Sequence, residues 1–381
     1  MSGEGSTLNL LRKSYELLSS VKLALALLII ILACCVVGVT TMSQERSWFL
    51  IFSTVWFNGL LVLLVANVGF CFFGRIWGRK VTLISFGMIL FHLSFIAMFL
   101  GIVYNSMFYF RGMMRLTEGE TLPNSDLKSF DVVEKGRFFD IAKFTGETTL
   151  VRMHSNYQID GQNKRAAYEI AVGRGRSQKQ GIIYVTKKLV YKGFQYFNDR
   201  EGFSLLVLLH DKRGKEVYGA HIPLQSLKQE LPQTMPVGQP QDLKQPNAGY
   251  LYTTGTRDGP GSFAYPNDPF EPMYVLQVVY VPTQLKERAG DAVFKVWPFT
   301  HEPPKPGDSP MAEGKVRIGE RFRIGDRSLS IGEVRYWVMM SVRYEPGKPI
   351  VLTSLWIGLG GMIITFFGRM MKRSFQSTAI S

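Results

Sequence analysis

The sequence predicts a membrane protein of mixed α and β structure, with four transmembrane helices and a large antiparallel β-rich domain outside the cytoplasm, inserted between helices 3 and 4. Four apolar stretches carry no Asp, Glu, Lys or Arg, and each is close to or above the roughly 20 residues that cross a bilayer core. Only 19% of the chain is charged, below the roughly 25% of an average soluble protein. The long segment before the last stretch contains many short alternating windows, which are typical of strands.

The four apolar stretches are predicted to span the membrane because none shows the polar stripe of a helix that packs on a soluble core. The first is too long for the apolar region of a typical signal peptide, so we expect it to be retained. The predicted transmembrane helices cover residues 23–42, 47–74, 81–104 and 350–368.

Basic residues beside the spans predict the orientation. In short loops, Lys and Arg collect on the cytoplasmic side of a membrane. We therefore expect a cytoplasmic N-terminus (1–22), a cytoplasmic tail (369–381) and an extracytoplasmic domain (105–349). Part of the net charge of +14 thus sets topology, and we expect no nucleic-acid partner. The basic residues concerned are Arg12, Lys13, Lys22, Arg75, Arg79, Lys80, Arg369, Lys372 and Arg373.

The outer domain is expected to be a sandwich or an open barrel. Asp211–Gly214 lies between two alternating windows and predicts a hairpin turn. Pro223–Glu230 suggests a short helix. Residues 189–197 carry aromatic side chains at both alternating positions, which predicts one strand covered on both faces. The predicted strands are Ser129–Val133, Thr148–Arg152, Tyr168–Val172, Gly181–Thr186, Leu189–Phe197, Phe203–His210, Met273–Val281 and Ser328–Tyr344.

The three cysteines, Cys34, Cys35 and Cys71, all lie inside predicted spans. We interpret them as small packing residues, because free cysteine is commonly buried. The sequence has no CxxC and no CxxCH, so it predicts neither a thiol–disulfide exchange site nor a c-type haem held by this chain. Nothing in the sequence indicates catalytic residues.

His92 lies near the middle of the third predicted span. An imidazole in the lipid zone is costly unless it bonds something, so it is a candidate functional residue. Three roles fit: an interhelical hydrogen bond, a proton relay, or an axial ligand to haem or a metal. The other histidines are His154, His210, His221 and His301, which are scattered without metal-ligand spacing.

Several short motifs resemble the ResB-like proteins of system II cytochrome c biogenesis. Ser20–Leu25 leads into the first span, Ser47–Phe49 opens the second, and Asn67 and Arg75 close it, as in that family. His92 falls where the family has its intramembrane histidine. Glu118–Glu120 follows the third span as a similar acidic step does, and Tyr344–Pro349 precedes the last span.

The resemblance implies a subunit of a cytochrome c synthetase in the bacterial cytoplasmic (inner) membrane, with its large domain on the periplasmic face. Such a subunit helps move haem outward and present it, with a ResC/CcsA-type membrane partner, to apocytochrome c. It would be a non-catalytic or co-catalytic subunit of a holocytochrome c synthase of the lyase type. The haem would be b-type and non-covalent, and no metal other than its iron is implied.

The same resemblance gives roles to individual residues. His92 would be an axial haem ligand, and a second ligand must come from another subunit because no other histidine lies in the predicted spans. Arg75, Arg79 and Lys80 are candidates to contact haem propionates at the cytoplasmic mouth. The positive-inside rule alone also accounts for these charges. The tryptophan-rich haem-handling motif belongs to the partner in that family and is not present in this sequence.

Two alternatives stay open. The chain would fit a haem-containing respiratory subunit, although a lone intramembrane histidine argues against a stable b-type carrier. It would also fit a membrane-anchored scaffold or assembly protein without haem.

Overall fold

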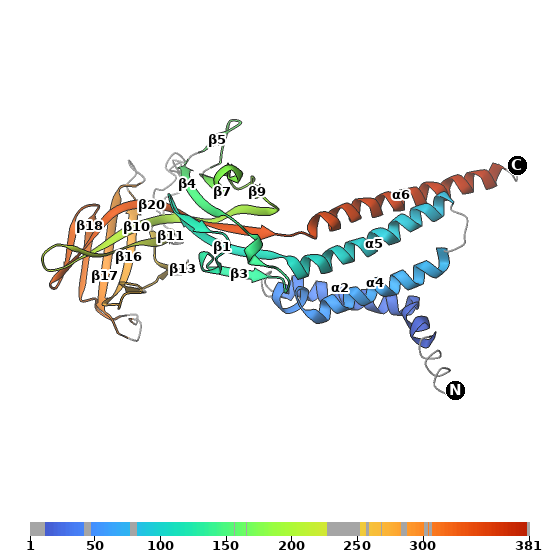
Figure 1. Cartoon of the computed structure of the whole chain (residues 1–381), viewed down its shortest axis with the longest axis horizontal. Coiled ribbons are helices and arrows are strands. Elements are labelled where there is room, and N and C mark those ends of the chain that lie inside the picture. The colour runs from blue at the N-terminus through green and yellow to red at the C-terminus, as the bar shows by residue number, and fades with distance from the viewer. Residues whose placement is uncertain are drawn as a thin grey trace, which may run out of the picture. The chain divides into compact units, whose positions relative to one another are not determined.

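The computed structural model describes residues 12–41, 47–76, 82–155, 157–164, 166–226, 252–256, 259–267, 269–282, 288–300, 304 and 307–378. The chain forms two compact units. One unit comprises Met1–Arg111, Glu134–Asp140 and Arg343–Ser381, and it holds the long helices. The other comprises Gly112–Val133 and Ile141–Val342, and it is built of strands. The chain is therefore an α + β protein in which an antiparallel β-sheet domain follows the N-terminal helices and precedes the C-terminal helix in chain order (Figure 1).

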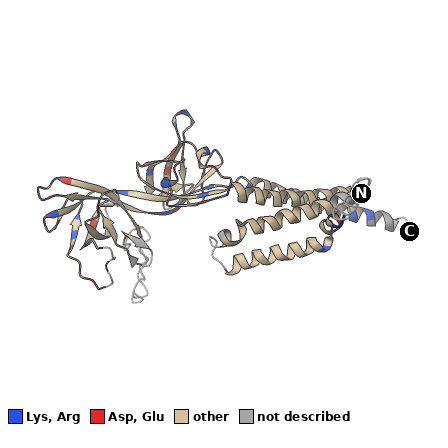
Figure 2. Ribbon diagram, turned by 60° about the horizontal axis from the view of Figure 1, so that its bottom comes forward, with Lys and Arg blue, Asp and Glu red and all other residues tan. Residues whose placement is uncertain are grey.

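The helical unit consists mainly of α2 (Val21–Thr41), α4 (Val55–Ile76), α5 (Leu83–Phe108) and α6 (Lys348–Thr378). Within the described residues, three stretches are long and apolar enough to cross a membrane: Val21–Thr41, Leu83–Phe108 and Lys348–Lys372. The apolar part of α4, Val55–Cys71, is shorter. Figure 2 shows these helices almost free of charged residues along most of their described length.

The stretch 47–74 differs from the single helix that the sequence predicts. Trp48–Phe52 forms a π-helical turn, and α4 begins only at Val55. The Thr54 hydroxyl donates a hydrogen bond to the carbonyl oxygen of Ile51 (2.6 Å) at this break. Thr and Ser side chains can bond backbone groups in this way, which favours an interruption of the helix.

Small residues allow α5 and α6 to pack closely, side by side and antiparallel. Gly87, Ser94 and Gly101 recur every seven residues on α5, the spacing that keeps one seam facing a partner helix. An ideal Cβ at Gly87 would lie 2.7 Å from the carbonyl oxygen of Gly361, and one at Gly358 would lie 2.4 Å from Ser94 Oγ. Close backbone approach of this kind holds helices together in lipid, where hydrophobic burial gives no net drive.

Among the described residues, the strands form a twelve-stranded sheet and a four-stranded sheet, besides two small hairpins. The main path of the large sheet runs β18 (Ala312–Arg317), β17 (Gly290–Pro298), β16 (Tyr274–Pro282), β12 (Tyr252–Thr253), β11 (Glu216–Ser226), β10 (Phe194–His210), β20 (Arg327–Tyr344), β1 (Phe110–Thr117) and β3 (Val132–Lys135). Off this path, β15 (Phe263–Tyr265) pairs with β16, β19 (Arg321–Ile324) with β20, and β9 (Leu189–Tyr191) with β10. The smaller sheet runs β2 (Thr121–Pro123), β4 (Glu147–Ser155), β7 (Ala166–Gly173) and β8 (Lys179–Ile183).

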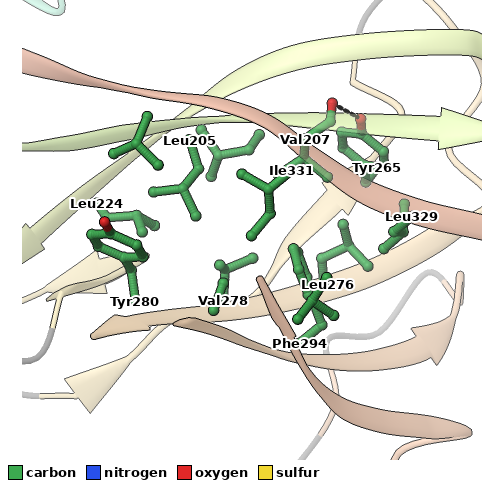
Figure 3. Close-up of a cluster of buried hydrophobic side chains, with 14 of the residues drawn as sticks. Leu205, Val207, Leu224, Tyr265, Leu276, Val278, Tyr280, Phe294, Leu329 and Ile331 are labelled. Carbon is green, nitrogen blue, oxygen red and sulfur yellow. Dashed lines mark hydrogen bonds between the residues drawn. The ribbon is translucent and has the colours of Figure 1, made fainter. Parts of the chain in front are cut away.

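One hydrophobic core lies inside the curved large sheet. Leu205 and Val207 of β10 pack with Leu276 and Val278 of β16, together with Phe294 of β17 (Figure 3). All five are fully buried. A bridge between Ile318 and Ile331 brings the end of β18 back to β20, so this part of the sheet nearly closes around its core.

Two sequence predictions in the β unit need correction, and one is confirmed. The predicted strand 189–197 is a hairpin, because Lys192 and Gly193 both take positive φ (47° and 85°) as a two-residue type I′ turn requires. Residues 223–226 of the predicted helix Pro223–Glu230 belong to strand β11, where Pro223 pairs with Ser204, and residues 227–230 lie outside the described residues. The hairpin turn at Asp211–Gly214 is confirmed.

Candidate functional site

The candidate site centres on His92, which lies on α5 between residues that are buried against other helices and residues that are exposed. Its Nδ1 lies 2.8 Å from the carbonyl oxygen of Met88, one turn earlier in the same helix. A carbonyl oxygen only accepts, so Nδ1 must carry the proton of this hydrogen bond. In a neutral imidazole of this tautomer, Nε2 is the acceptor nitrogen, which is the atom that a metal would bind.

Among the described residues, the side of α5 that bears His92 is more deeply buried in its C-terminal half. Phe99 and Val103 lie further along α5, and both are buried (8% and 6% exposed) in a cluster with residues of α2 and α4. His92 lies two turns before Phe99 on the same side of the helix, yet it is only half-buried, and Met88 is 41% exposed. His92 is therefore less buried than the residues two turns further along the same side of α5.

Aromatic rings line the helix next to His92. The Phe91 ring meets the imidazole edge to face, with centroids 5.6 Å apart. The ring centroid of Phe95 lies 4.8 Å from that of Phe91, and the ring centroid of Phe99 lies 6.0 Å from that of Phe95. Flat apolar groups of this kind suit a planar hydrophobic ligand.

Polar side chains inside the bundle tie the helices together. Asn58 Nδ2 donates to Ser106 Oγ across α4 and α5 (2.9 Å), and both residues are buried. The fully buried Asn67 donates from Nδ2 to the carbonyl oxygens of Leu18 (2.7 Å) and Ser20 (3.1 Å). Such interhelical hydrogen bonds fix the relative positions of membrane helices.

Asn67 and Cys71 together cap the interruption before α2. The Cys71 thiol lies one turn after Asn67 on α4, and it donates to the carbonyl oxygen of Ser19 (2.8 Å). Residues 12–18 are helical and α2 begins at Val21, so Asn67 and Cys71 bind carbonyl oxygens where one helix ends and the next begins. The Ser20 carbonyl also accepts a hydrogen bond from the Ala24 amide (3.2 Å). Cys71 thus does more than fill space, which differs from the packing role that the sequence predicts. The signal that could have indicated this is the i, i+4 spacing of two polar side chains in an uncharged segment.

A charged cluster marks the point where α5 and α6 leave the apolar region. Glu345 is paired with Arg111 (3.2 Å) and Lys348 (3.3 Å), and its side chain is 12% exposed. Burial by itself raises the pKa of Glu345, but Lys348 and Arg111 outweigh it and hold that pKa below its ordinary value. Asn105 of α5 accepts a hydrogen bond from the Gly347 amide (3.2 Å).

The structure describes only part of the predicted site. His92 is fully described. Arg75 lies in α4, but its side chain is not among the described parts, and Arg79 and Lys80 lie outside the described residues. The contact of the three basic side chains with haem propionates at the cytoplasmic mouth therefore stays a prediction.

The outer-domain histidines make separate contacts, and His301 lies outside the described residues. His154 Nε2 lies 3.4 Å from Glu169, and His210 Nε2 lies 2.8 Å from Ser330 Oγ. His221 contacts Ser204 (3.3 Å) and Glu333 (3.5 Å). Burial, and then the charge of Arg335, lower the pKa of His221. Across the described ranges, no three His, Cys, Asp or Glu side chains gather as a metal site.

The acidic step after the third predicted span is part of the β unit's own structure. Glu118 pairs with Arg288 (2.7 Å) and accepts a hydrogen bond from the Met153 amide (3.3 Å). Glu120 accepts from the Thr117 amide (2.7 Å), which closes the turn that follows β1. Both carboxylates therefore have structural partners.

The apolar helices define a multi-pass membrane protein that also has a separate unit built of β-sheets. The model of the ResB-like family matches residues 76–373, more than three quarters of the chain. The chain belongs to the ResB-like family, and membership implies a role in cytochrome c biogenesis of the system II type. Among curated proteins, none matches the chain.

Proposed function

We propose that this chain is the haem-handling membrane subunit of a system II cytochrome c synthetase. In this role it helps move haem across the membrane and, with a ResC/CcsA-type partner, presents it to apocytochrome c. The observation that carries the proposal is His92, an imidazole in an apolar helix whose Nδ1 is bonded to the Met88 carbonyl. Family membership supports the same process.

The residues around His92 fit a haem. Histidines that bind metals usually donate their other ring N–H to a carbonyl or carboxylate, which fixes the ring and its tautomer. His92 has this arrangement with Met88, and neighbouring phenylalanines provide apolar surface. A bound b-type haem supplies an iron that accepts imidazole nitrogen as an axial ligand. This chain's contribution would be to hold Nε2 in place and to keep water away with its apolar helix.

The second axial ligand would come from the partner. The sequence has five histidines, and the other four lie in the segment between the third and fourth predicted spans. Met88, one turn before His92, is 41% exposed, and this supports a contact of this part of α5 with a helix of another subunit. The complete site would therefore form only in the complex, and this chain would act as a non-catalytic or co-catalytic subunit.

The proposed topology has four spans, with the π-turn and α4 together forming the second. Both termini would face the cytoplasm, with 1–22 and 369–381 outside the bilayer on that side. Residues 105–349 would form the periplasmic domain, whose nearly closed large sheet supports an open-barrel architecture. Arg75, Arg79 and Lys80 would lie at the cytoplasmic mouth, where they would attract the haem propionates by charge pairing.

Purification of the chain from cells that express a ResC/CcsA-type protein tests this function. The expected result is a complex of both proteins with a Soret band, together with loss of c-type cytochromes when the gene for this chain is deleted. A haem-free chain together with normal c-type cytochromes after deletion would favour the scaffold alternative. Quinol turnover by the isolated chain would favour a respiratory subunit.

A further inference from the structure

A short segment of the sequence between two β-unit stretches belongs to the helical unit instead. Glu134–Asp140, whose first two residues end strand β3, groups with the helices, although residues on both sides of it belong to the β unit. Two backbone hydrogen bonds fix it, from the Gly136 amide to the Tyr109 carbonyl (2.8 Å) and from the Phe138 amide to the Met107 carbonyl (2.9 Å). Because α5 ends at Phe108, the segment lies directly against the end of that helix.

Packing holds the segment closely in this place. An ideal Cβ at Gly136 would lie 2.4 Å from the Met107 carbonyl oxygen, so only glycine allows this approach. Phe139 is buried (8% exposed) and stacks on Phe110, with centroids 4.9 Å apart. The Phe139 ring also contacts the ring of Tyr344, with centroids 5.9 Å apart. Phe139 therefore anchors the segment, and its neighbour Phe138 is left on the outside.

Phe138 is 57% exposed, although it is part of this tightly held segment. The centroid of its ring lies 5.9 Å from that of Phe108, and the Phe108 centroid lies 4.9 Å from that of Tyr104. Tyr104 and Met107 are themselves exposed (42% and 36%) on α5. Phe138 thus extends the exposed surface of a helix that is apolar enough to cross a membrane.

We propose that Phe138 inserts into the lipid of the outer leaflet, so that Glu134–Asp140 is a membrane-interface element. Lipid is the occupant because the Phe138 surface is continuous with the exposed face of α5. The expected depth of Phe138 in the bilayer also fits the outer leaflet, since the charged cluster of Arg111, Glu345 and Lys348 lies at the same end of α5 and α6. Aromatic rings collect at this depth of a bilayer, and the flanking Lys135 and Arg137 suit the headgroup layer.

This inference depends on the proposed crossing of the membrane by α5, and the experiment separates the two. Trifluoromethyl-phenylalanine is placed singly at position 138, 104 or 270 of the full chain in nanodiscs. Line broadening of the fluorine signal is then measured with lipid carrying a nitroxide near its headgroup and with a water-soluble gadolinium chelate. Position 104 reports α5, and Phe270 is a matched control because it is 55% exposed in the β unit.

The expected result is that the label at 138, like that at 104, is broadened by the nitroxide lipid and protected from gadolinium, whereas the label at 270 shows the reverse. A label at 138 that behaves like the one at 270 would overturn the inference while leaving the spanning of α5 intact. Protection of 138 from both reagents would also overturn it, because protein then covers this side chain. Absence of lipid broadening at 104 would remove the proposed span and the inference with it.

Discussion

Gly361 and Gly360 are adjacent in α6 but face different surroundings, which makes them a sensitive test of the α5–α6 contact. A Cβ at Gly361 would lie 2.7 Å from the Gly87 carbonyl oxygen and 2.8 Å from the Phe91 amide nitrogen. Ordinary contact begins at 3.4 Å, and both obstacles are backbone atoms that cannot rotate away. For a Cβ at Gly360, nothing in the described part of the chain lies within 4 Å.

The structure therefore predicts opposite effects for the same substitution. Gly361→Ala must push the helices apart by several tenths of an ångström, and overpacking of this kind costs about 1–3 kcal/mol. Gly360→Ala meets no obstacle, and the better helix propensity of alanine is worth up to about 1 kcal/mol in water. This propensity gain is shared by both variants, so their difference of about 1–3 kcal/mol reports packing alone.

The assay is reversible unfolding of the full chain by SDS in mixed micelles, followed by circular dichroism. Gly361→Ala should unfold at a lower SDS fraction than the parent protein, whereas Gly360→Ala should match or exceed the parent. Equal stability of the two variants would refute the close α5–α6 packing.

Three further substitutions test other parts of the structure. Asn67→Ala removes the donor to the Leu18 and Ser20 carbonyls. It should lower the free energy of unfolding in the same SDS titration by about 1–3 kcal/mol. An unchanged titration would contradict a stabilising role for these two hydrogen bonds. Gly202→Ala should lower the thermal midpoint of the β unit, since its Cβ would lie 1.9 Å from the Leu224 carbonyl oxygen, which accepts from Trp337 (2.8 Å). Gly332→Ala, whose Cβ meets only leucine side chains at 3.1–3.2 Å, should be milder, and equal midpoints would argue against the reasoning. The pKa of Glu345 in the folded protein lies below its ordinary value of 4.5. The ionised carboxylate therefore stabilises the fold above about pH 4.5, and this stabilisation is lost as the pH falls through the lowered pKa. Glu345→Gln should therefore be less stable than the parent at neutral pH and lose less stability on acidification, and parallel pH curves would count against the ion cluster.

The sequence predicts the apolar helices well because uncharged runs of about 20 residues are rare outside transmembrane helices. It predicts their boundaries less well. The break at Ser53 and Thr54 depends on a local hydroxyl–carbonyl bond in an uninterrupted apolar run, and hydropathy does not register such a bond. The hairpin at Lys192 and Gly193 resembles a continuous strand in the sequence because aromatic residues on both sides conceal the two-residue turn.

For the candidate site, the sequence identifies His92 because it is a lone imidazole in an uncharged helix. It does not reveal the Met88 carbonyl that orients the ring, since a backbone group leaves no trace in side-chain patterns. The sequence also does not reveal that Glu134–Asp140 packs with the helical unit. The backbone contacts of Gly136 and Phe138 with the end of α5 arise only from the tertiary fold.

Rescue by free imidazole in the purified complex tests the proposed bond between His92 Nε2 and haem iron. His92→Gly removes the ligand and leaves space for imidazole at the same position, and His154→Gly serves as a control in the β unit. The account predicts that His92→Gly loses or shifts the Soret band, that added imidazole restores it, and that His154→Gly keeps the parental spectrum. An unchanged haem content and spectrum in His92→Gly would contradict the claim.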